Sequence, residues 1–259
     1  MARRRAVILG SSSGFGAAAA RAFAAQGMGI FGAHMDRRGG MPAVEALIEE
    51  LKGYDVPVVF HNGNAADDDH RAAGVSALKD AMGEGDTVGV LLHSLAFGTL
   101  RPFFGEGGTI GRRHLDMTLD VMANSLVYWA QDLVSEGLLT EGARVYAMTS
   151  SGSLAAWPSY GAVSAAKCAL ESHVRQLAVE LAPLGVTANA IMAGVTQTPA
   201  LSKIPGSDAI AETALRRNPH GRLTTPEDVA DCLVALMGPG TRWLTGNVLR
   251  VDGGEAISG

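Results

Sequence analysis

The chain has 259 residues and a formal net charge of −5, and 47% of its residues are apolar. This composition suits one large α/β domain, and the acidic balance argues against a nucleic-acid partner. No apolar run approaches the ~18 residues of a membrane span, so no membrane contact is expected. We interpret Arg3–Arg5 as a solvated tail rather than a targeting signal. Cys168 and Cys232 lack metal-ligand spacing and indicate reduced core residues of a cytoplasmic protein that binds no metal.

Short apolar runs alternate with helical patterns along the whole chain. The predicted strands are Ala6–Leu9, Gly29–Ala33, Val56–Phe60, Val88–Leu92, Arg144–Met148, Val186–Ile191 and Val248–Val251. The predicted helices are Ala17–Gln26, Met41–Lys52, Asp68–Met82, Leu115–Glu136, Tyr160–Ala182 and Pro226–Met237. This alternation predicts a single Rossmann-like domain over residues 1–259. Its doubly wound parallel sheet has about seven strands, with helices on both faces.

The connection over residues 196–218 breaks this pattern. It follows the sixth predicted strand and carries Pro199 and Pro205 beside one amphipathic piece, DAIAETALRR. In doubly wound sheets, ligands bind beyond the carboxyl ends of the strands. We therefore predict a movable flap that covers the substrate; a plain helical connection is the alternative.

The stretch GSSSGFG follows the first predicted strand and opens the first helix. Its glycines allow a tight turn and let phosphate approach the backbone, and the helix N-terminus supplies free N–H groups. This arrangement predicts a dinucleotide site. The residues predicted to form this part of it are Gly10, Ser12, Ser13, Gly14, Phe15 and Gly16.

The spacing G-x-x-x-G-x-G resembles the short-chain dehydrogenase/reductase superfamily. The likeness covers nearly the whole chain, with LLHSLAFG after the fourth strand, MTSS after the fifth, NAIMAGVTQTP after the sixth and VDGG at the last. It implies an oxidoreductase with a nicotinamide cofactor. It also implies cofactor contacts from Asn64, Ala65, Ser94, Leu95, Ala96 and Gly194, from the Val195 backbone to the carboxamide, and from Thr198 to the pyrophosphate.

The end of the second predicted strand bears on which nicotinamide is used. His34 stands where an acid accepts the adenine ribose hydroxyls in NAD enzymes, and Asp36 comes two residues later. Arg37 and Arg38 follow, and two guanidinium groups can clamp a 2′-phosphate. We favour NADPH on this basis, with NADH as the alternative because of Asp36.

Tyr160 and Lys167 lie seven residues apart, whereas ketone-reducing members of the superfamily carry Tyr-x-x-x-Lys. The residue four before Lys167 is Val163, which has no hydroxyl. Three further residues shift the tyrosine by ~4.5 Å along a helix. When an enoyl thioester is reduced, charge develops on an oxygen ~2–3 Å further from the hydride-accepting carbon than in ketone reduction. A donor that stabilises this charge must follow the oxygen, so the spacing favours a C=C substrate.

The Tyr-x6-Lys spacing resembles the enoyl-acyl carrier protein reductase branch of the superfamily. HSLAFG after the fourth strand, Ala193 in AGVTQT and Met122 in place of a catalytic asparagine agree with it. The resemblance implies that Tyr160 stabilises the enolate and that Lys167 binds the nicotinamide ribose. Ser150, or alternatively its neighbour Ser151, is expected to position the carbonyl. Two features depart from the commonest members of the branch: the glycine loop has the ordinary superfamily form, which a less common group of enoyl reductases combines with Tyr-x6-Lys, and Ser150 stands where many members carry a second tyrosine.

The expected activity is reduction of the C=C bond of a trans-2-enoyl thioester, carried on acyl carrier protein or coenzyme A, in fatty acid biosynthesis. The resemblance further implies a homotetramer or homodimer formed through the predicted helices Leu115–Glu136 and Tyr160–Ala182. Phe97, Leu100, Phe103, Phe104 and Trp157 are candidates to wall an acyl channel, and Arg112 and Arg113 to meet a carrier phosphate; core packing and solvated charge are the alternatives. An atypical carbonyl reductase or alcohol dehydrogenase and a non-catalytic nucleotide sensor also stay open.

Overall fold

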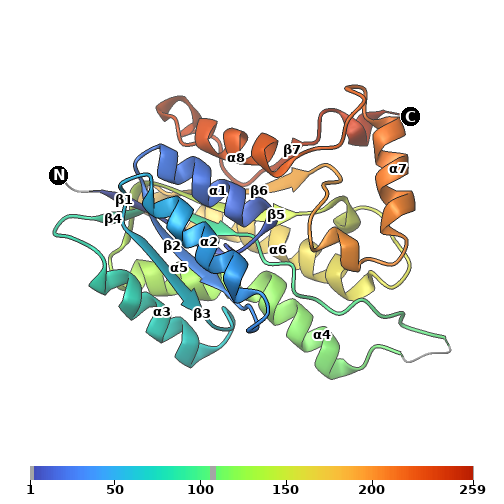
Figure 1. Ribbon diagram of the computed structural model, residues 1–259, viewed down its shortest axis with the longest axis horizontal. Coiled ribbons are helices and arrows are strands. Elements are labelled where there is room, and N and C mark those ends of the chain that lie inside the picture. The colour runs from blue at the N-terminus through green and yellow to red at the C-terminus, as the bar shows by residue number, and fades with distance from the viewer. Residues whose placement is uncertain (1–2, 106–108, 259) are drawn as a thin grey trace.

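Seven parallel strands form one sheet in the computed structural model, which describes residues 3–105 and 109–258 (Figure 1). The strands are β1 (Arg4–Leu9), β2 (Gly29–His34), β3 (Val58–Asn62), β4 (Thr87–His93), β5 (Leu139–Thr149), β6 (Thr187–Ala193) and β7 (Val248–Val251). Their order is β3-β2-β1-β4-β5-β6-β7, and every neighbouring pair is parallel. The order reverses between β1 and β4, which marks the ligand-binding crevice in sheets of this kind. The predicted fold class is confirmed.

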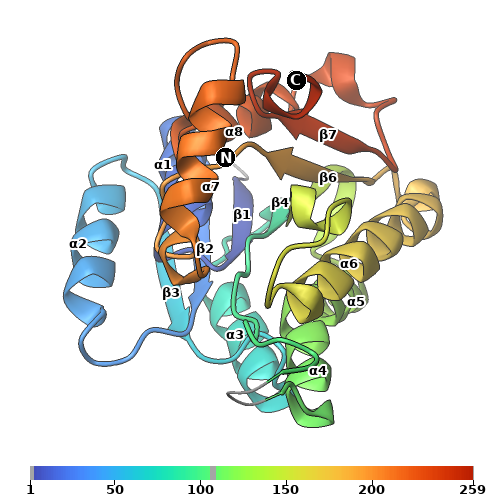
Figure 2. The ribbon, with the colours of Figure 1, turned by 90° about the vertical axis from the view of Figure 1, so that its right-hand side faces the viewer.

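Helices cover both faces of the sheet (Figure 2). The helices on one face are α1 (Gly14–Ala25), α2 (Met41–Lys52) and α8 (Pro226–Ala235), and those on the other are α3 (Asp68–Asp80), α4 (Arg112–Leu119), α5 (Ser125–Ser135) and α6 (Gly161–Glu180). Successive β1 residues point to opposite faces, so Val7 and Leu9 join the core under α5 and α6, while Ala6 and Ile8 join the core under α1 and α8. A strand segment covered on both faces must be apolar, as residues Ala6–Leu9 of β1 are.

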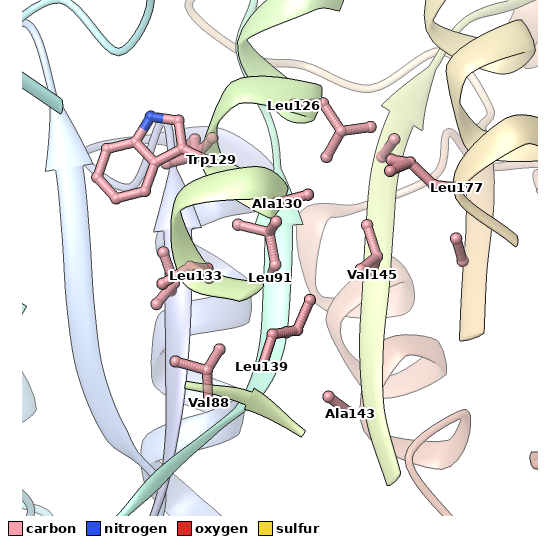
Figure 3. Packing of buried hydrophobic residues seen from close by; sticks show 14 of the residues in the cluster. Val88, Leu91, Leu126, Trp129, Ala130, Leu133, Leu139, Ala143, Val145 and Leu177 are labelled. Atoms are coloured by element: carbon pink, nitrogen blue, oxygen red, sulfur yellow. The ribbon is translucent and has the colours of Figure 1, made fainter. Parts of the chain in front are cut away.

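The core beneath α5 fixes one part of the carboxyl edge of the sheet (Figure 3). Leu126, Trp129 and Leu133 lie on one face of α5, and each is at most 1% exposed. The Trp129 ring packs against Phe31 with 5.9 Å between ring centroids, and its Nε1–H donates to the Ala65 carbonyl at 2.9 Å. A buried indole N–H needs such a partner, so this bond ties the loop after β3 to the core.

The predicted helix Leu115–Glu136 is interrupted in the structure. α4 gives way to a π-helical segment over Asp120–Asn124, and α5 follows. The Ser125 hydroxyl donates to the Val121 carbonyl at 2.8 Å and lies 3.0 Å from His93 Nε2. A side chain that bonds into the helical ladder explains the local widening, and π-helical turns of this kind are frequent at functional sites.

Two other expectations are corrected by the structure. Arg3–Arg5 is not a solvated tail, because β1 begins at Arg4, and Arg5 is buried and pairs with Asp86 at 2.5 Å. Cys168 is exposed on α6 rather than in the core, and Cys232 is half-buried. Within the described part of the chain, no helix has the length and apolarity needed to cross a membrane.

Candidate active site

The connection between β1 and α1 requires glycine at Gly10 and Gly16. Gly10 has a φ of +87°, and a Cβ on it would lie 2.4 Å from the Ser94 carbonyl oxygen. A Cβ on Gly16 would lie 1.9 Å from the Gly10 carbonyl oxygen. The N-cap residue Ser13 makes no side-chain cap bond, so the first N–H groups of α1 keep their donors for an anion. This cradle fits the pyrophosphate of a dinucleotide.

The other wall of the cradle comes from segments remote in sequence. The Ser94 N–H donates to Leu9 O at 2.8 Å, so the residues after β4 lie beside the loop after β1. Leu95 Cδ2 lies 3.2 Å from the Cβ position of Gly10, and Thr198 Cγ2 lies 3.4 Å from that of Gly14. The structure thus brings the predicted residues Ser94, Leu95 and Thr198 to the glycine loop.

The end of β2 carries a histidine–aspartate pair. His34 is buried and its Nδ1 lies 3.0 Å from Asp36 Oδ2. Arg37 and Arg38 follow on the exposed side of the turn, and neither forms an ion pair with any described residue. Asn64 follows β3 and accepts from the Ala66 N–H through its own side chain. The nearby cationic groups therefore remain available to an anion.

Lys167 is a buried amine in the middle of the sheet's carboxyl edge. It is 5% exposed, and its Nζ donates to the Met148 carbonyl at 2.7 Å and approaches the Leu95 carbonyl at 3.4 Å. Burial lowers the pKa of Lys167 to about 8, while the nearby Glu171 carboxylate acts in the opposite direction. An ammonium has three N–H donors, so one is left for a ligand hydroxyl.

Tyr160 is the N-cap residue of α6, directly before the helix rather than at its first position as predicted. Its side chain is 8% exposed, and its hydroxyl lies 3.5 Å from Ser150 Oγ, which follows β5. Burial raises the pKa of Tyr160, so the phenol stays protonated and acts as a hydrogen-bond donor at neutral pH. The two predicted hydroxyl groups are therefore brought together, about two helical turns from Lys167.

Gly152 was not singled out from the sequence, yet it sets the position of the Tyr160 ring. A Cβ on Gly152 would lie 2.3 Å from Tyr160 Cε1. The Gly152 N–H donates to Ser150 Oγ at 3.1 Å, which fixes the glycine against the ring. Because SGS is a common loop sequence, only the folded chain reveals this contact.

His93 is a second unpredicted residue at the site. It is fully buried at the end of β4, and burial, together with the Lys167 charge, lowers the pKa of His93 to about 3. The Ser125 hydroxyl gives its only proton to Val121 O, so neutral His93 donates to Ser125 through Nε2. His93 links β4 to the residue that follows the π-helical segment. In the sequence, the only indication of this link was a polar residue at the end of an apolar strand.

The loop after β6 is closed by the C-terminal turn. The Val195 N–H donates to Glu255 Oε2 at 2.9 Å, and the Thr196 hydroxyl donates to Gly194 O at 2.9 Å. A Cβ on Gly194 would lie 2.4 Å from Thr224 Oγ1, so this position also requires glycine. The sequence offered no sign of Glu255.

The proposed channel residues range from packed against the Tyr160 cluster to largely exposed. Leu100 and Trp157 pack against a buried cluster that contains Tyr160, and the Phe103 ring lies against Gly161. Phe97, Phe103 and Phe104 are 49%, 50% and 89% exposed. Arg112 contacts Asp116 at 3.3 Å on α4, and Arg113 lies beside it, facing a surface hollow also lined by Asp120 and Asn124. α7 (Ser207–Arg217), within the predicted flap, lies beyond the carboxyl edge of the sheet (Figure 1).

Residues 10–255 match the family described as enoyl-(acyl carrier protein) reductase. The chain belongs to this family. It is 30% identical over 257 residues to 1-cyclohexenylcarbonyl-CoA reductase of Streptomyces collinus, covering 98% of this chain and 88% of that protein. It is 32% identical over 224 residues to the NADH-dependent enoyl-(acyl-carrier-protein) reductase of Aquifex aeolicus, covering 84% of this chain and 79% of the relative.

Solved structures agree with this membership. The crystal structure of the enoyl-(acyl-carrier-protein) reductase (NADH) from Aquifex aeolicus superimposes with a TM-score of 0.84 at 27% identity, covering 100% of this chain and 98% of the other. The enoyl-(acyl carrier protein) reductase family lies within the short-chain dehydrogenase/reductase superfamily. The resemblance to both that the sequence motifs indicated is confirmed. The protein is an oxidoreductase of that superfamily.

Proposed function

We propose that this protein reduces the C=C bond of a trans-2-enoyl thioester with hydride from a nicotinamide cofactor. The observation that carries the proposal is the position of the buried Tyr160 hydroxyl, beside Ser150 and seven residues before Lys167. Val163, at the place of the tyrosine in ketone reducers, is 5% exposed and offers no donor. The Tyr160 hydroxyl is therefore better placed to donate to an oxygen that lies further from the hydride-accepting carbon than a ketone oxygen does.

Each side chain has a role in this proposal. Tyr160 donates its hydroxyl proton in a hydrogen bond to the thioester carbonyl and stabilises the enolate. Lys167 holds ribose hydroxyls and places a positive charge near the site, which favours negative charge on the substrate oxygen. Ser150 helps to position the carbonyl. A bound NADPH or NADH supplies the hydride.

The relatives support a thioester substrate. The Streptomyces collinus protein is named for a CoA thioester whose ring double bond is conjugated with the carbonyl, and the Aquifex aeolicus protein for an enoyl group on acyl carrier protein. Both names denote the same electronic change, hydride addition to a C=C bond activated by a thioester. Either carrier fits the proposal.

NADPH is the proposed cofactor. Arg37 and Arg38 are exposed beside the end of β2, whereas Asp36 is engaged by His34. The double substitution Arg37→Ala/Arg38→Ala should weaken NADPH binding about tenfold or more and leave NADH binding unchanged, because a 2′-phosphate is the only group that distinguishes them. Equal losses for both cofactors would favour NADH, the cofactor in the name of the Aquifex aeolicus relative.

The reaction is tested with crotonyl-CoA and acetoacetyl-CoA, following oxidation of the reduced cofactor by absorbance. Crotonyl-CoA should be reduced and acetoacetyl-CoA should not. Tyr160→Phe should lower kcat about 100-fold or more without changing cofactor affinity, whereas Tyr54→Phe, an exposed tyrosine, should have no effect. Reduction of the acetoacetyl ester alone would favour the carbonyl reductase, and cofactor binding with no turnover would favour the sensor.

A homodimer or homotetramer acting in cytoplasmic fatty acid biosynthesis is also proposed. Leu115 and Leu119 on α4 are each 37% exposed, as apolar residues of a subunit contact would be in a separated chain. Light scattering of the purified protein gives its mass directly. A monomer at micromolar concentration would contradict this part of the proposal.

A further inference from the structure

The C-terminal turn reaches the backbone group that the proposed function assigns to the cofactor. Glu255 Oε2 accepts from the Val195 N–H at 2.9 Å and lies 2.9 Å from the position that a Cβ on Gly194 would take. The same N–H is the expected donor to the carboxamide oxygen of a nicotinamide. One N–H does not make two short, linear hydrogen bonds at once, so the carboxylate and the carboxamide exclude each other.

We propose that Glu255 sets cofactor affinity by occupying the Val195 N–H in the cofactor-free protein and releasing it to the nicotinamide carboxamide. The inference rests on the nicotinamide cofactor of the proposed function but not on the substrate. The free energy of cofactor binding is reduced by the loss of the Glu255–Val195 bond. A charge-assisted bond to a backbone N–H is among the stronger hydrogen bonds in proteins, so this loss is measurable.

The turn that carries Glu255 is held in one conformation. The Asp252 carboxylate accepts from the N–H groups of Gly254 at 3.0 Å and Ala256 at 3.1 Å, on either side of Glu255. The Asn218 side chain donates to the Asp252 carbonyl at 3.0 Å. The carboxylate is therefore presented to Val195 by an ordered turn, at no further cost in chain entropy.

The turn that contains Glu255 also contacts α7. Arg217, at the end of this helix, donates twice to the Ser258 carbonyl, at 2.9 and 3.2 Å, and α7 packs on the short helix Glu255–Ile257. Both lie together at one end of the molecule (Figure 1). Release of Glu255 thus acts on the segment against which the predicted flap rests.

The test is direct measurement of NADPH and NADH binding, without substrate, by the fluorescence of the reduced nicotinamide. Glu255→Ala frees the Val195 N–H, so both cofactors should bind about five- to tenfold more tightly than to the wild type. Glu255→Gln, which keeps a neutral acceptor, should give an intermediate affinity. Glu45→Ala, an exposed glutamate on α2, is the matched control and should leave both affinities unchanged.

Amide hydrogen exchange of the cofactor-free protein provides a second measurement. The Val195 N–H should exchange faster in Glu255→Ala than in the wild type, with unchanged exchange in β1 as the sign of an intact fold. Unchanged or weaker cofactor binding by a folded Glu255→Ala variant would overturn the inference, and weaker binding would make Glu255 a direct cofactor ligand. Failure of the wild type to bind either cofactor would instead reject the proposed function itself.

Discussion

Gly152→Ala tests whether the position of the Tyr160 ring controls the reaction. The new Cβ would lie 2.3 Å from Tyr160 Cε1 and 2.9 Å from Cδ1, whereas carbon atoms in contact stay ~3.5 Å apart. Something must move by roughly 1 Å. The backbone is held by the bond from the Gly152 N–H to Ser150 Oγ. The Tyr160 ring is therefore the group expected to shift. Its centroid lies 6.1 Å from that of the neighbouring Trp157 ring.

A misplacement of 1 Å in a catalytic group lowers the rate by about 10²-fold. Gly152→Ala should therefore reduce kcat with crotonyl-CoA about 100-fold, because the hydroxyl no longer meets the thioester oxygen. Cofactor affinity and the melting temperature should change little. Gly240→Ala is the matched control, since a Cβ there meets no atom within 4 Å. Wild-type kcat in a folded Gly152→Ala protein would refute the reasoning.

Three further predictions concern the cradle, the core and the buried amine. Gly16→Ala should lower cofactor affinity at least about tenfold in a binding titration, because its Cβ would lie 1.9 Å from the Gly10 carbonyl oxygen; an affinity within twofold of wild type would contradict this. Asp86→Ala leaves the guanidinium of Arg5, whose side chain is 5% exposed, buried without its carboxylate. It should reduce the free energy of unfolding by about 3–5 kcal/mol in urea titrations, and a loss below about 1 kcal/mol would show that water reaches the charge. Since burial lowers the pKa of Lys167 to about 8, its positive charge is lost as pH rises through that value, and kcat/KM for the enoyl thioester should fall above it. A profile that stays flat to about pH 10 would show that this charge is not used.

The sheet was predictable because parallel strands must be apolar on both faces. The β1 residues Ala6–Leu9 are fully buried, and the sequence AVIL carries no polar residue that would allow another reading. β3 begins and ends two residues later than predicted. Its first four residues are only half-buried and Asn62 is exposed, so the apolar pattern is weaker than in the central strands. Strand ends are set by pairing with β2, which local sequence does not encode.

The interruption of the long helix could not be predicted from its own residues. Asp120–Asn124 has an ordinary helical composition. The π-helical turn depends on Ser125 meeting both Val121 O and His93, and His93 comes from a strand 32 residues earlier. Such a bond exists only after β4 and the helix have packed together.

The candidate site shows the same difference between local sequence patterns and contacts that form only in the folded chain. Tyr160, Lys167 and Ser150 could be proposed from the sequence because the spacing of the tyrosine and lysine, and the serine's place after a strand, are local information. Gly152 and Glu255 were missed because their roles arise from contacts across the fold, a ring against a glycine and a carboxylate against a backbone N–H. No periodicity or motif announces contacts of this kind.

The packing around Val163 adds a steric reason for the displaced tyrosine. A Cβ on Gly98 would lie 2.8 Å from Val163 Cγ2 and 2.6 Å from Met122 Sδ, so the loop after β4 presses directly on both side chains. Val163 is 5% exposed and shares a buried cluster with Tyr160 and Met122. Val163 is therefore closely packed on the side that faces Gly98 and Met122, and a larger side chain at this position would meet the loop there. Two features thus coincide at the position of the ketone reducers' tyrosine: Val163 has no hydroxyl, and Gly98 and Met122 lie directly beside it. A donor at Tyr160, one turn earlier, is the arrangement that this packing permits.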